Sequence, residues 1–257
     1  MPPRTMTVSF DCESKLKMSS QLGLVSKMAE RLLDGTAEPE LSCLGLFDRS
    51  TSMNERPQES EHRKIDQLNA GIQTLPAEIL KDPQAARRVR LAAITFGGKV
   101  EIAQSFVPAS AFKLPTFEAH GDTPMAEALL QGLDLLEERR VICEKRDRDI
   151  YGPWMCLVTD GHSTSSARLM ERVRQRIHET DSPERGPRQI AFFAVGVEGA
   201  DMQQLAWLSR RAPLKLKGFD YGRMFAWLGQ SLKHMSQKNP GERGRTANPR
   251  DFDMEVG

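Results

Sequence analysis

The spacing of apolar positions alternates regularly along the chain from Leu41 onward. Four runs are apolar almost throughout: residues 41–47, 89–96, 154–159 and 190–197. Runs of this length and character are typical of strands that are covered on both faces. Between them, apolar residues recur every three or four positions, which predicts helices with one buried face. The main helices are expected within residues 65–79, 124–136, 169–177, 202–208 and 221–235.

Strands that alternate with helices predict an α/β fold, here a doubly wound, mainly parallel six-stranded sheet flanked by helices. The fifth strand is residues 99–106, which return after the turn at Gly97-Gly98 as an antiparallel partner of the preceding strand. The sixth is a short edge strand at residues 214–216. The domain is expected to span residues 41–237.

The two ends of the chain do not follow this alternation. Residues 1–40 form an N-terminal extension whose structure the pattern does not define. Residues 238–257 are rich in Asn, Pro, Gly and charged residues, which predicts a disordered tail.

Composition narrows the possible functions. The 257 residues include 36 basic and 35 acidic ones, a net charge of +1, which provides no general attraction to nucleic acid or to an anionic membrane. The four cysteines form no CxxC pair, and the sequence shows neither a signal peptide nor an apolar stretch that could span a bilayer. We expect a cytoplasmic protein whose cysteines are reduced.

Polar residues follow two of the buried runs directly. Asp48, Ser50 and Ser52 alternate after the first, Asp160 follows the third, and Thr123 precedes a predicted helix. Ligands of such sheets bind beyond the carboxyl ends of the strands. Two carboxylates and three hydroxyls are hard oxygen ligands, which suit Mg²⁺ or Mn²⁺. Each residue alone could equally cap a helix or a turn, but their joint placement favours a metal site.

These five residues, in this order, resemble the metal-ion-dependent adhesion site (MIDAS) of von Willebrand factor A (VWA) domains. The resemblance covers roughly residues 41–237 and looks closest to the bacterial, tellurium-resistance-associated TerY-like group. The stretches that carry it are Asn69-Ala-Gly-Ile-Gln, Ala93-Ile-Thr-Phe96, Ala194-Val-Gly-Val197 and Phe225-x-Trp227-Leu.

The resemblance implies a protein-binding module rather than an enzyme, with no catalytic residues. Its metal would complete its coordination with an acidic side chain of a protein partner. An adaptor or scaffold in a bacterial stress-response or phage-defence system is implied, with a phosphatase or kinase of the same system as a candidate partner.

The segment Asp48-x-Ser50-x-Ser52 departs from the family pattern, because Arg49 and Thr51 stand where small residues are usual. One hypothesis is that Arg49 lies at the rim and attracts an acidic partner. The alternative is that it pairs with a local acid such as Glu55 or Asp122.

Other functions remain as alternatives. A Mg²⁺-dependent phosphohydrolase would use Asp48 as its nucleophile, but it would need a second acid where this chain has Ser50. A scaffold with a vestigial site would tolerate the loss of Asp48. His120 and His162 fall in loops beside the site, either as solvated residues or as parts of a rim that selects the partner.

Overall fold

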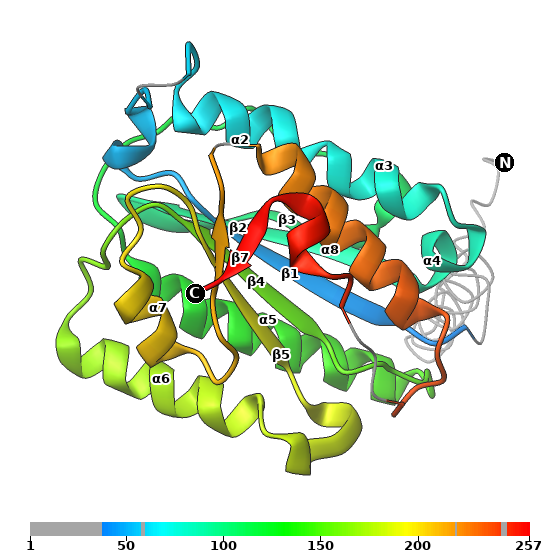
Figure 1. Cartoon of the computed structure of the whole chain (residues 1–257). Coiled ribbons are helices and arrows are strands. Elements are labelled where there is room, and N and C mark those ends of the chain that lie inside the picture. Colours follow the sequence, from blue (N-terminus) through cyan, green and yellow to red (C-terminus); the bar gives the residue numbers. More distant parts are fainter. Residues whose placement is uncertain (1–37, 58–59, 219, 243–245) are drawn as a thin grey trace, which may run out of the picture. The chain divides into compact units, whose positions relative to one another are not determined.

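Seven strands form one mixed sheet in the order β3-β2-β1-β4-β5-β6-β7 (Figure 1). The computed structural model describes residues 38–57, 60–218, 220–242 and 246–257. The predicted N-terminal extension, apart from residues 38–40, therefore lies outside the described residues. The strands are β1 (Leu41–Asp48), β2 (Val89–Gly97), β3 (Lys99–Pro108), β4 (Trp154–Thr159), β5 (Ala191–Gly196), β6 (Leu214–Leu216) and β7 (Met254–Val256).

The predicted fold class is confirmed, with seven strands among the described residues rather than six. The predicted edge strand, β6, lies between β5 and β7. Strands β2, β1, β4, β5 and β6 pair in parallel, and β3 returns antiparallel to β2. The helices are α2 (Lys64–Ile72), α3 (Thr74–Leu80), α4 (Pro83–Arg88), α5 (Met125–Lys145), α6 (Ala167–Thr180), α7 (Met202–Leu208) and α8 (Tyr221–Ser236). The single apolar stripe at residues 65–79 is divided between α2 and α3, which meet at Gln73.

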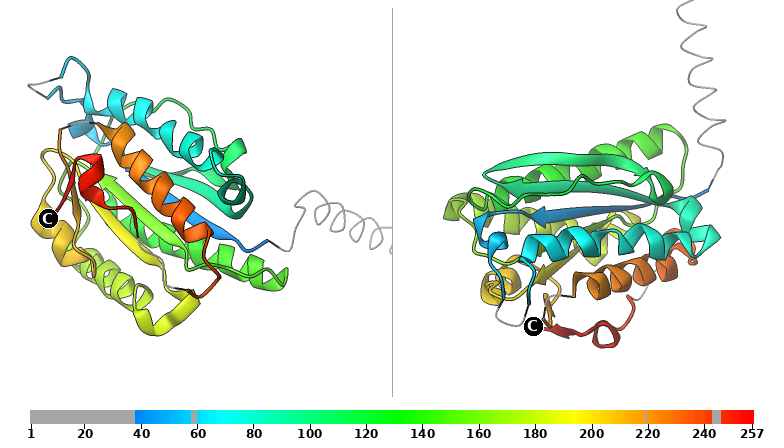
Figure 2. Two further views of the ribbon diagram at one scale, coloured as in Figure 1. Left: turned by 45° about the vertical axis from the view of Figure 1, so that its right-hand side comes forward. Right: turned by 90° about the horizontal axis from the view of Figure 1, so that it is seen from above.

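The sheet lies between two helix layers (Figure 2). On β1, Cys43 and Phe47 face the layer that contains α2, α3 and α8, while Leu44 and Leu46 face α5 and α6. Successive strand side chains point to opposite faces, so an almost unbroken apolar run is what a strand with two covered faces requires. In the described part of the chain, no helix is long and apolar enough to cross a membrane.

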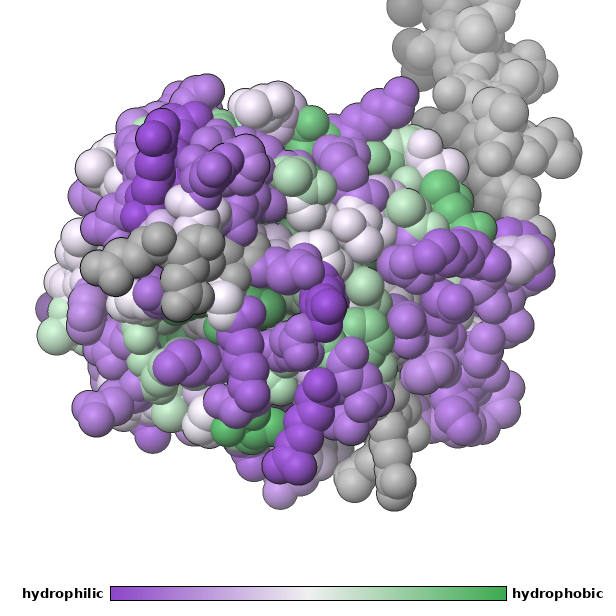
Figure 3. Space-filling model, turned by 45° about the horizontal axis from the view of Figure 1, so that its top comes forward, coloured by the Kyte–Doolittle hydropathy of each residue, from purple (hydrophilic) through white to green (hydrophobic). Residues whose placement is uncertain are grey.

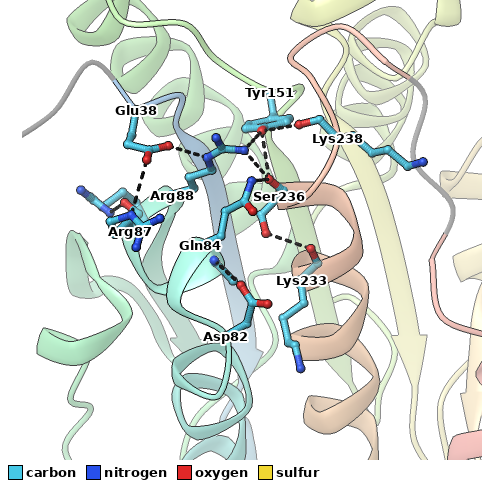
Figure 4. A network of polar contacts seen from close by, with 11 residues as sticks. Glu38, Asp82, Gln84, Arg87, Arg88, Tyr151, Lys233, Ser236 and Lys238 are labelled. Atoms are coloured by element: carbon cyan, nitrogen blue, oxygen red, sulfur yellow. Dashed lines mark hydrogen bonds and ion pairs between the residues drawn. The ribbon is translucent and has the colours of Figure 1, made fainter.

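Polar networks fix the end of the sheet where β1 begins. The Arg88 guanidinium donates to Glu38 at 2.7 Å, to the Tyr151 hydroxyl at 2.9 Å and to the Ser236 carbonyl at 2.7 Å (Figure 4). The Tyr151 hydroxyl donates in turn to the Lys238 carbonyl at 2.7 Å. These bonds join the entry to β1, the end of α4 and the end of α8.

A second network at this end is centred on Glu40, which is 1% exposed. Arg139 of α5 donates to both of its carboxylate oxygens at 2.7 Å, and Arg148 donates at 3.0 Å. A buried carboxylate is tolerated only when cations and donors surround it in this way. Both networks lie at the end of the sheet where β1 begins, and Asp48 lies at the other end of that strand. The networks link the helix layers at this end.

The last residues of the chain correct one expectation. The segment predicted to be a disordered tail contains a short 3-10 helix, Pro249–Phe252, and strand β7, which pairs antiparallel with β6. The Trp227 indole donates to the Ala247 carbonyl at 2.9 Å, and Met254 is 1% exposed. The sequence does not indicate β7 because Met254 and Val256 lie among polar and charged residues typical of a disordered tail.

We predict that Met254→Ala lowers the free energy of unfolding by about 2–4 kcal/mol, because it removes a buried side chain and leaves a cavity. Val256 lies in the same strand but is 60% exposed, so Val256→Ala is the matched control and should change stability little. Urea denaturation measures both. Equal, small losses in the two variants would show that β7 does not dock as described.

Candidate metal centre

The predicted site residues converge where neighbouring parallel strands end. Asp48 is the last residue of β1, and Asp160 follows the last residue of β4. These two strands pair side by side, with Phe47 opposite Val158. Strand β2 lies on one side of β1 and β4 on the other, so the connections leave in opposite directions from this point. It is the switch point at which sheets of this kind bind ligands.

Hydrogen bonds fix the Asp48 carboxylate on both oxygens. The Ser50 backbone N–H donates to Oδ1 at 2.8 Å, and the Thr159 hydroxyl donates to Oδ2 at 2.5 Å. Asp48 is 0% exposed and Thr159 is also fully buried. Thr159 was not among the predicted site residues, although it is part of the Val-Thr-Asp-Gly stretch that ends β4.

The two serines link the two carboxylates. The Ser50 and Ser52 hydroxyl oxygens lie 3.1 Å apart, and the Ser52 hydroxyl donates to Asp160 Oδ1 at 2.6 Å. Four of the five predicted residues thus form one continuous chain of polar contacts, from Asp48 through Ser50 and Ser52 to Asp160. A short 3-10 helix, Thr51–Asn54, begins within this D-x-S-x-S segment, with Ser50 at its N-cap.

Hydrogen bonds hold the loop that carries Thr123 between the loop after β1 and the loop after β4. Its backbone exchanges hydrogen bonds with Thr164, from the Thr123 N–H to the Thr164 hydroxyl at 3.1 Å and from the Thr164 N–H to the Thr123 carbonyl at 3.0 Å. On the other side, the Thr51 N–H donates to the Gly121 carbonyl at 2.9 Å. Thr123 is 6% exposed, and the structure shows no hydrogen bond from its hydroxyl to the other four predicted residues.

Gly121 is required for this close packing of loops. Its φ is +74°, and a Cβ at this position would lie 2.4 Å from the Cα of Gly98. A side chain would therefore push the Thr123 loop away from the turn between β2 and β3.

Burial controls the ionisation of Asp48. Loss of solvent raises the pKa of Asp48 to about 6, and the neighbouring Asp160 charge adds to this rise. The hydrogen bonds from Ser50 and Thr159 oppose it, because they stabilise the ionised form. The site therefore holds a carboxylate whose negative charge is under-compensated by the protein.

Lys64 is a site residue that the sequence did not reveal. Its ammonium lies 2.8 Å from Asp160 Oδ2 and 2.8 Å from Glu55 Oε2, and only 6% of its side chain is exposed. Burial works against the charge, but the two carboxylates outweigh it, so the pKa of Lys64 lies above its ordinary value. At the start of a helix, a lysine normally indicates a solvated position, and no feature of the sequence distinguishes this one.

Tyr221, the first residue of α8, is the second such residue. Its side chain is buried, and its hydroxyl has no hydrogen-bond partner among the described residues. Burial raises the pKa of Tyr221, and the charges of Asp160 and Asp48 raise it further. The phenol is therefore a neutral group close to both carboxylates.

Arg49 does not take the rim position proposed for it. Its side chain is 12% exposed and forms an ion pair with Glu101 of β3. The structure thus shows the alternative, pairing with an acid of the chain, although the partner is Glu101 rather than Glu55 or Asp122. His120 and His162 are exposed, and His162 Nδ1 lies 3.0 Å from Asp201 Oδ2.

The donor set of the site is rich in hydroxyls. Within the described ranges there is no group of three or more His, Cys, Asp and Glu side chains that could hold a metal ion. A metal at the end of β1 and β4 would therefore depend on serine and threonine oxygens as well as on the two carboxylates. Hard, oxygen-seeking cations accept such ligands.

Comparison with known proteins shows similarity of fold. No family model and no curated protein match the sequence. The pilus adhesin SpaC from Lactobacillus rhamnosus GG is 12% identical with a TM-score of 0.55, over 79% of this chain and 31% of the adhesin. A point mutant of the PilB minor pilin from Streptococcus sanguinis is 10% identical with a TM-score of 0.53, over 78% of this chain and 62% of the pilin.

The VWA domain of SpRpn10 is 9% identical with a TM-score of 0.47, over 66% of this chain and 80% of that domain. The two likenesses with TM-scores above 0.5 support the α/β architecture described above. At such low identity they describe the architecture alone, and this chain spans less than a third of the adhesin's length.

We predict that Asp48→Asn stabilises the metal-free protein near neutral pH. The pKa of Asp48 is raised in the folded state, from 3.8 to about 6, so the folded protein holds this proton more tightly than the unfolded chain. Stability is then highest below the unfolded value and falls as the pH rises through this window. A shift of this size corresponds to at most about 3 kcal/mol at pH 7, which the neutral amide would recover.

Denaturation in chelator at about pH 7.5 and about pH 4 tests this, since the advantage of Asp48→Asn should vanish at the lower pH. Asp122→Asn, an exposed acid in the adjacent loop, is the control and should show no gain. An Asp48→Asn protein less stable than wild type at neutral pH would contradict the account.

Proposed function

We propose that this chain is a metal-dependent protein-binding module of the VWA type. Asp48, Ser50, Ser52, Thr123 and Asp160 would hold one Mg²⁺ or Mn²⁺ ion, and an acidic side chain of a protein partner would complete its coordination. The observation that carries the proposal is the continuous polar chain from Asp48 through the two serines to Asp160, at the switch point of the sheet.

The residues present fit a hard divalent cation. Two carboxylates and short hydroxyls supply oxygen ligands. The negative charge of the carboxylates does not exceed the positive charge of a divalent metal ion. A bound ion would supply a Lewis-acidic centre that attracts a carboxylate oxygen. The protein's part is to hold the ligands rigidly, which the hydrogen bonds to Asp48 and the bonded loops around Thr123 support.

The exposed surface is largely polar, and the acids on it near the site would not themselves attract an acidic partner, so the attraction would depend on the metal. The face shown in Figure 3 is mainly hydrophilic, with hydrophobic residues scattered across it. Around the site, Glu55, His120, Asp122, His162 and Glu198 are exposed. Polar rims of this kind surround many transient interfaces, in which a few central contacts supply most of the binding energy.

The biological setting is part of the proposal. The stretches of sequence that resemble the TerY-like group favour an adaptor or scaffold in a bacterial stress-response or phage-defence system, acting in the cytoplasm. A phosphatase or kinase of the same system would be the protein partner. This assignment rests on the sequence resemblance.

The rival function, a phosphohydrolase with Asp48 as nucleophile, is less compatible with the geometry. An aspartyl nucleophile must meet a phosphorus atom directly, whereas Asp48 is 0% exposed and both of its oxygens accept hydrogen bonds. A metal ion held between the neighbouring carboxylate and hydroxyl oxygens would need less space beside Asp48 than an in-line phosphoryl group. Ser50 also stands where the second acid of such enzymes would be.

Metal binding is the first test. We expect wild type to bind Mg²⁺ or Mn²⁺, and Asp48→Asn and Ser52→Ala to bind about tenfold more weakly or worse, because each loses a ligand oxygen or its charge. Titration calorimetry measures this. Asp48→Asn is informative because it is expected to be the more stable protein, so weaker binding would not reflect misfolding. Asp122→Asn is the control, and equal affinity in all four proteins would refute the site.

Ligand capture is the second test. Immobilised protein should bind a polyglutamate peptide in Mn²⁺ and release it in chelator, because the carboxylate needs the metal. A polyglutamine peptide of equal length should not bind in either condition. Binding of polyglutamate that persists in chelator, or in Asp48→Asn, would show that capture does not pass through this site.

A further inference from the structure

We infer that Lys64 is a built-in counter-cation of the metal centre, which weakens the hold of the site on its metal and strengthens the attraction of the loaded site for an anionic ligand. The inference rests on the proposed function, since it concerns the same site. It adds a residue outside the five-residue motif, and it assigns that residue a role in setting affinity.

The position of Lys64 is unusual for a lysine. It begins α2, and its ammonium lies between Asp160, whose side chain is 0% exposed, and Glu55, whose side chain is 67% exposed. The loop after β5 passes close by: Gly199 has a φ of +94°, and a Cβ there would lie 3.6 Å from Lys64 Nζ and 3.2 Å from the Asp160 carbonyl oxygen. A buried lysine held by two carboxylates is a fixed charge rather than a mobile surface group.

The Asp160 carboxylate is shared between two neighbours. Its Oδ1 accepts the Ser52 hydroxyl and so belongs to the polar chain of the metal centre, while its Oδ2 accepts the Lys64 ammonium. A cation bound to Oδ2 offsets part of the negative charge available at Oδ1. It also repels any metal ion held by the same carboxylate, and burial reduces the screening of this repulsion by water.

The formal charges of the site determine how it treats a ligand. Asp48, Asp160 and Lys64 together carry a charge of −1 when both acids are ionised. A divalent ion would bring this group to +1, whereas without Lys64 the same loaded group would be neutral. Lys64 therefore exchanges metal affinity for one additional positive charge at the loaded site, which favours an incoming carboxylate. Glu55, which pairs with Lys64 from the exposed side, reduces this gain.

Glu55 reduces the effect of the Lys64 charge on a bound metal and on an anionic ligand. It accepts from the same ammonium at 2.8 Å from the exposed side, and therefore competes with Asp160 for it. Removal of the Glu55 charge would leave Lys64 to Asp160 alone and would also remove a negative charge from the rim. Both changes disfavour the metal and favour an anionic ligand, so Glu55 and Lys64 should act with opposite signs.

The alternative is that Lys64 only stabilises the fold by pairing with Asp160. In that case its removal would leave a buried carboxylate without its cation, loosen the loop and weaken metal binding or leave it unchanged. The direction of the change in metal affinity separates the two roles.

The experiment is calorimetric titration with Mn²⁺ of wild type, Lys64→Met and Glu55→Gln. We expect Lys64→Met to bind Mn²⁺ about tenfold more tightly or better, and Glu55→Gln to bind it more weakly. Lys64→Arg keeps the charge and should stay near wild type. Arg63→Met is the matched control, because Arg63 is the adjacent cation but pairs with Asp66 and Glu118.

A second measurement uses the polyglutamate peptide at saturating Mn²⁺, where Lys64→Met should bind the peptide more weakly and Glu55→Gln more tightly. Circular dichroism checks folding, and Lys64→Gln replaces Lys64→Met if the latter does not fold. Wild type that binds Mn²⁺ while the neutral Lys64 variant binds it equally or less tightly overturns the inference alone. Wild type that binds no Mn²⁺ overturns the proposed function itself.

Discussion

Two carboxylates buried side by side at the ends of adjacent parallel strands are the constraint on which the rest of this site depends. Asp48 and Asp160 are 0% and 2% exposed, and strands β1 and β4 place them at one edge of the sheet. Like charges removed from water repel and are poorly solvated, so the protein must surround them with donors and cations. Ser50, Ser52, Thr159 and Lys64 are the groups that do this.

The rest of the fold makes that arrangement tolerable. Apolar packing on both faces of the sheet provides stability, which the buried charges at the ends of β1 and β4 reduce. The Glu40 and Arg88 networks fix the other end of the sheet, where β1 begins. The opposite end, where the candidate site lies, contains two unfavourable features: the raised pKa of Asp48 and the Tyr221 hydroxyl, which has no hydrogen-bond partner among the described residues. Local costs of this kind are expected where a site is organised for binding rather than for stability.

The sequence predicts a feature where strand ends bring residues together, even when they are far apart in the chain, as with Ser52 and Asp160. It does not predict a contact made by a side chain whose position no pattern marks. The strands and the contacts linking Asp48, Ser50, Ser52 and Asp160 follow from apolar runs that end in polar residues. Lys64 is the first residue of α2 and follows no strand end, so nothing in the sequence indicates that its side chain reaches Asp160. The partner of Arg49, Glu101 of β3, is likewise marked by no pattern. Strand β7 is not predicted because its residues lie within a segment rich in Asn, Pro, Gly and charge, whereas the equally short β6 shows the alternation Leu-Lys-Leu.

The charge balance of the centre explains why hydroxyls and a lysine stand where further carboxylates could have been used. Each added carboxylate would strengthen the hold on a cation, but it would also neutralise the cation and weaken its attraction for an incoming acid. Hydroxyl ligands and the ammonium of Lys64 have the opposite effect: they weaken the hold on the cation and leave more of its charge to attract an incoming acid. On the proposed function, binding energy is then directed to the partner rather than to retention of the metal. Metal and acidic partner would consequently bind with positive coupling, because each supplies a charge that the other lacks.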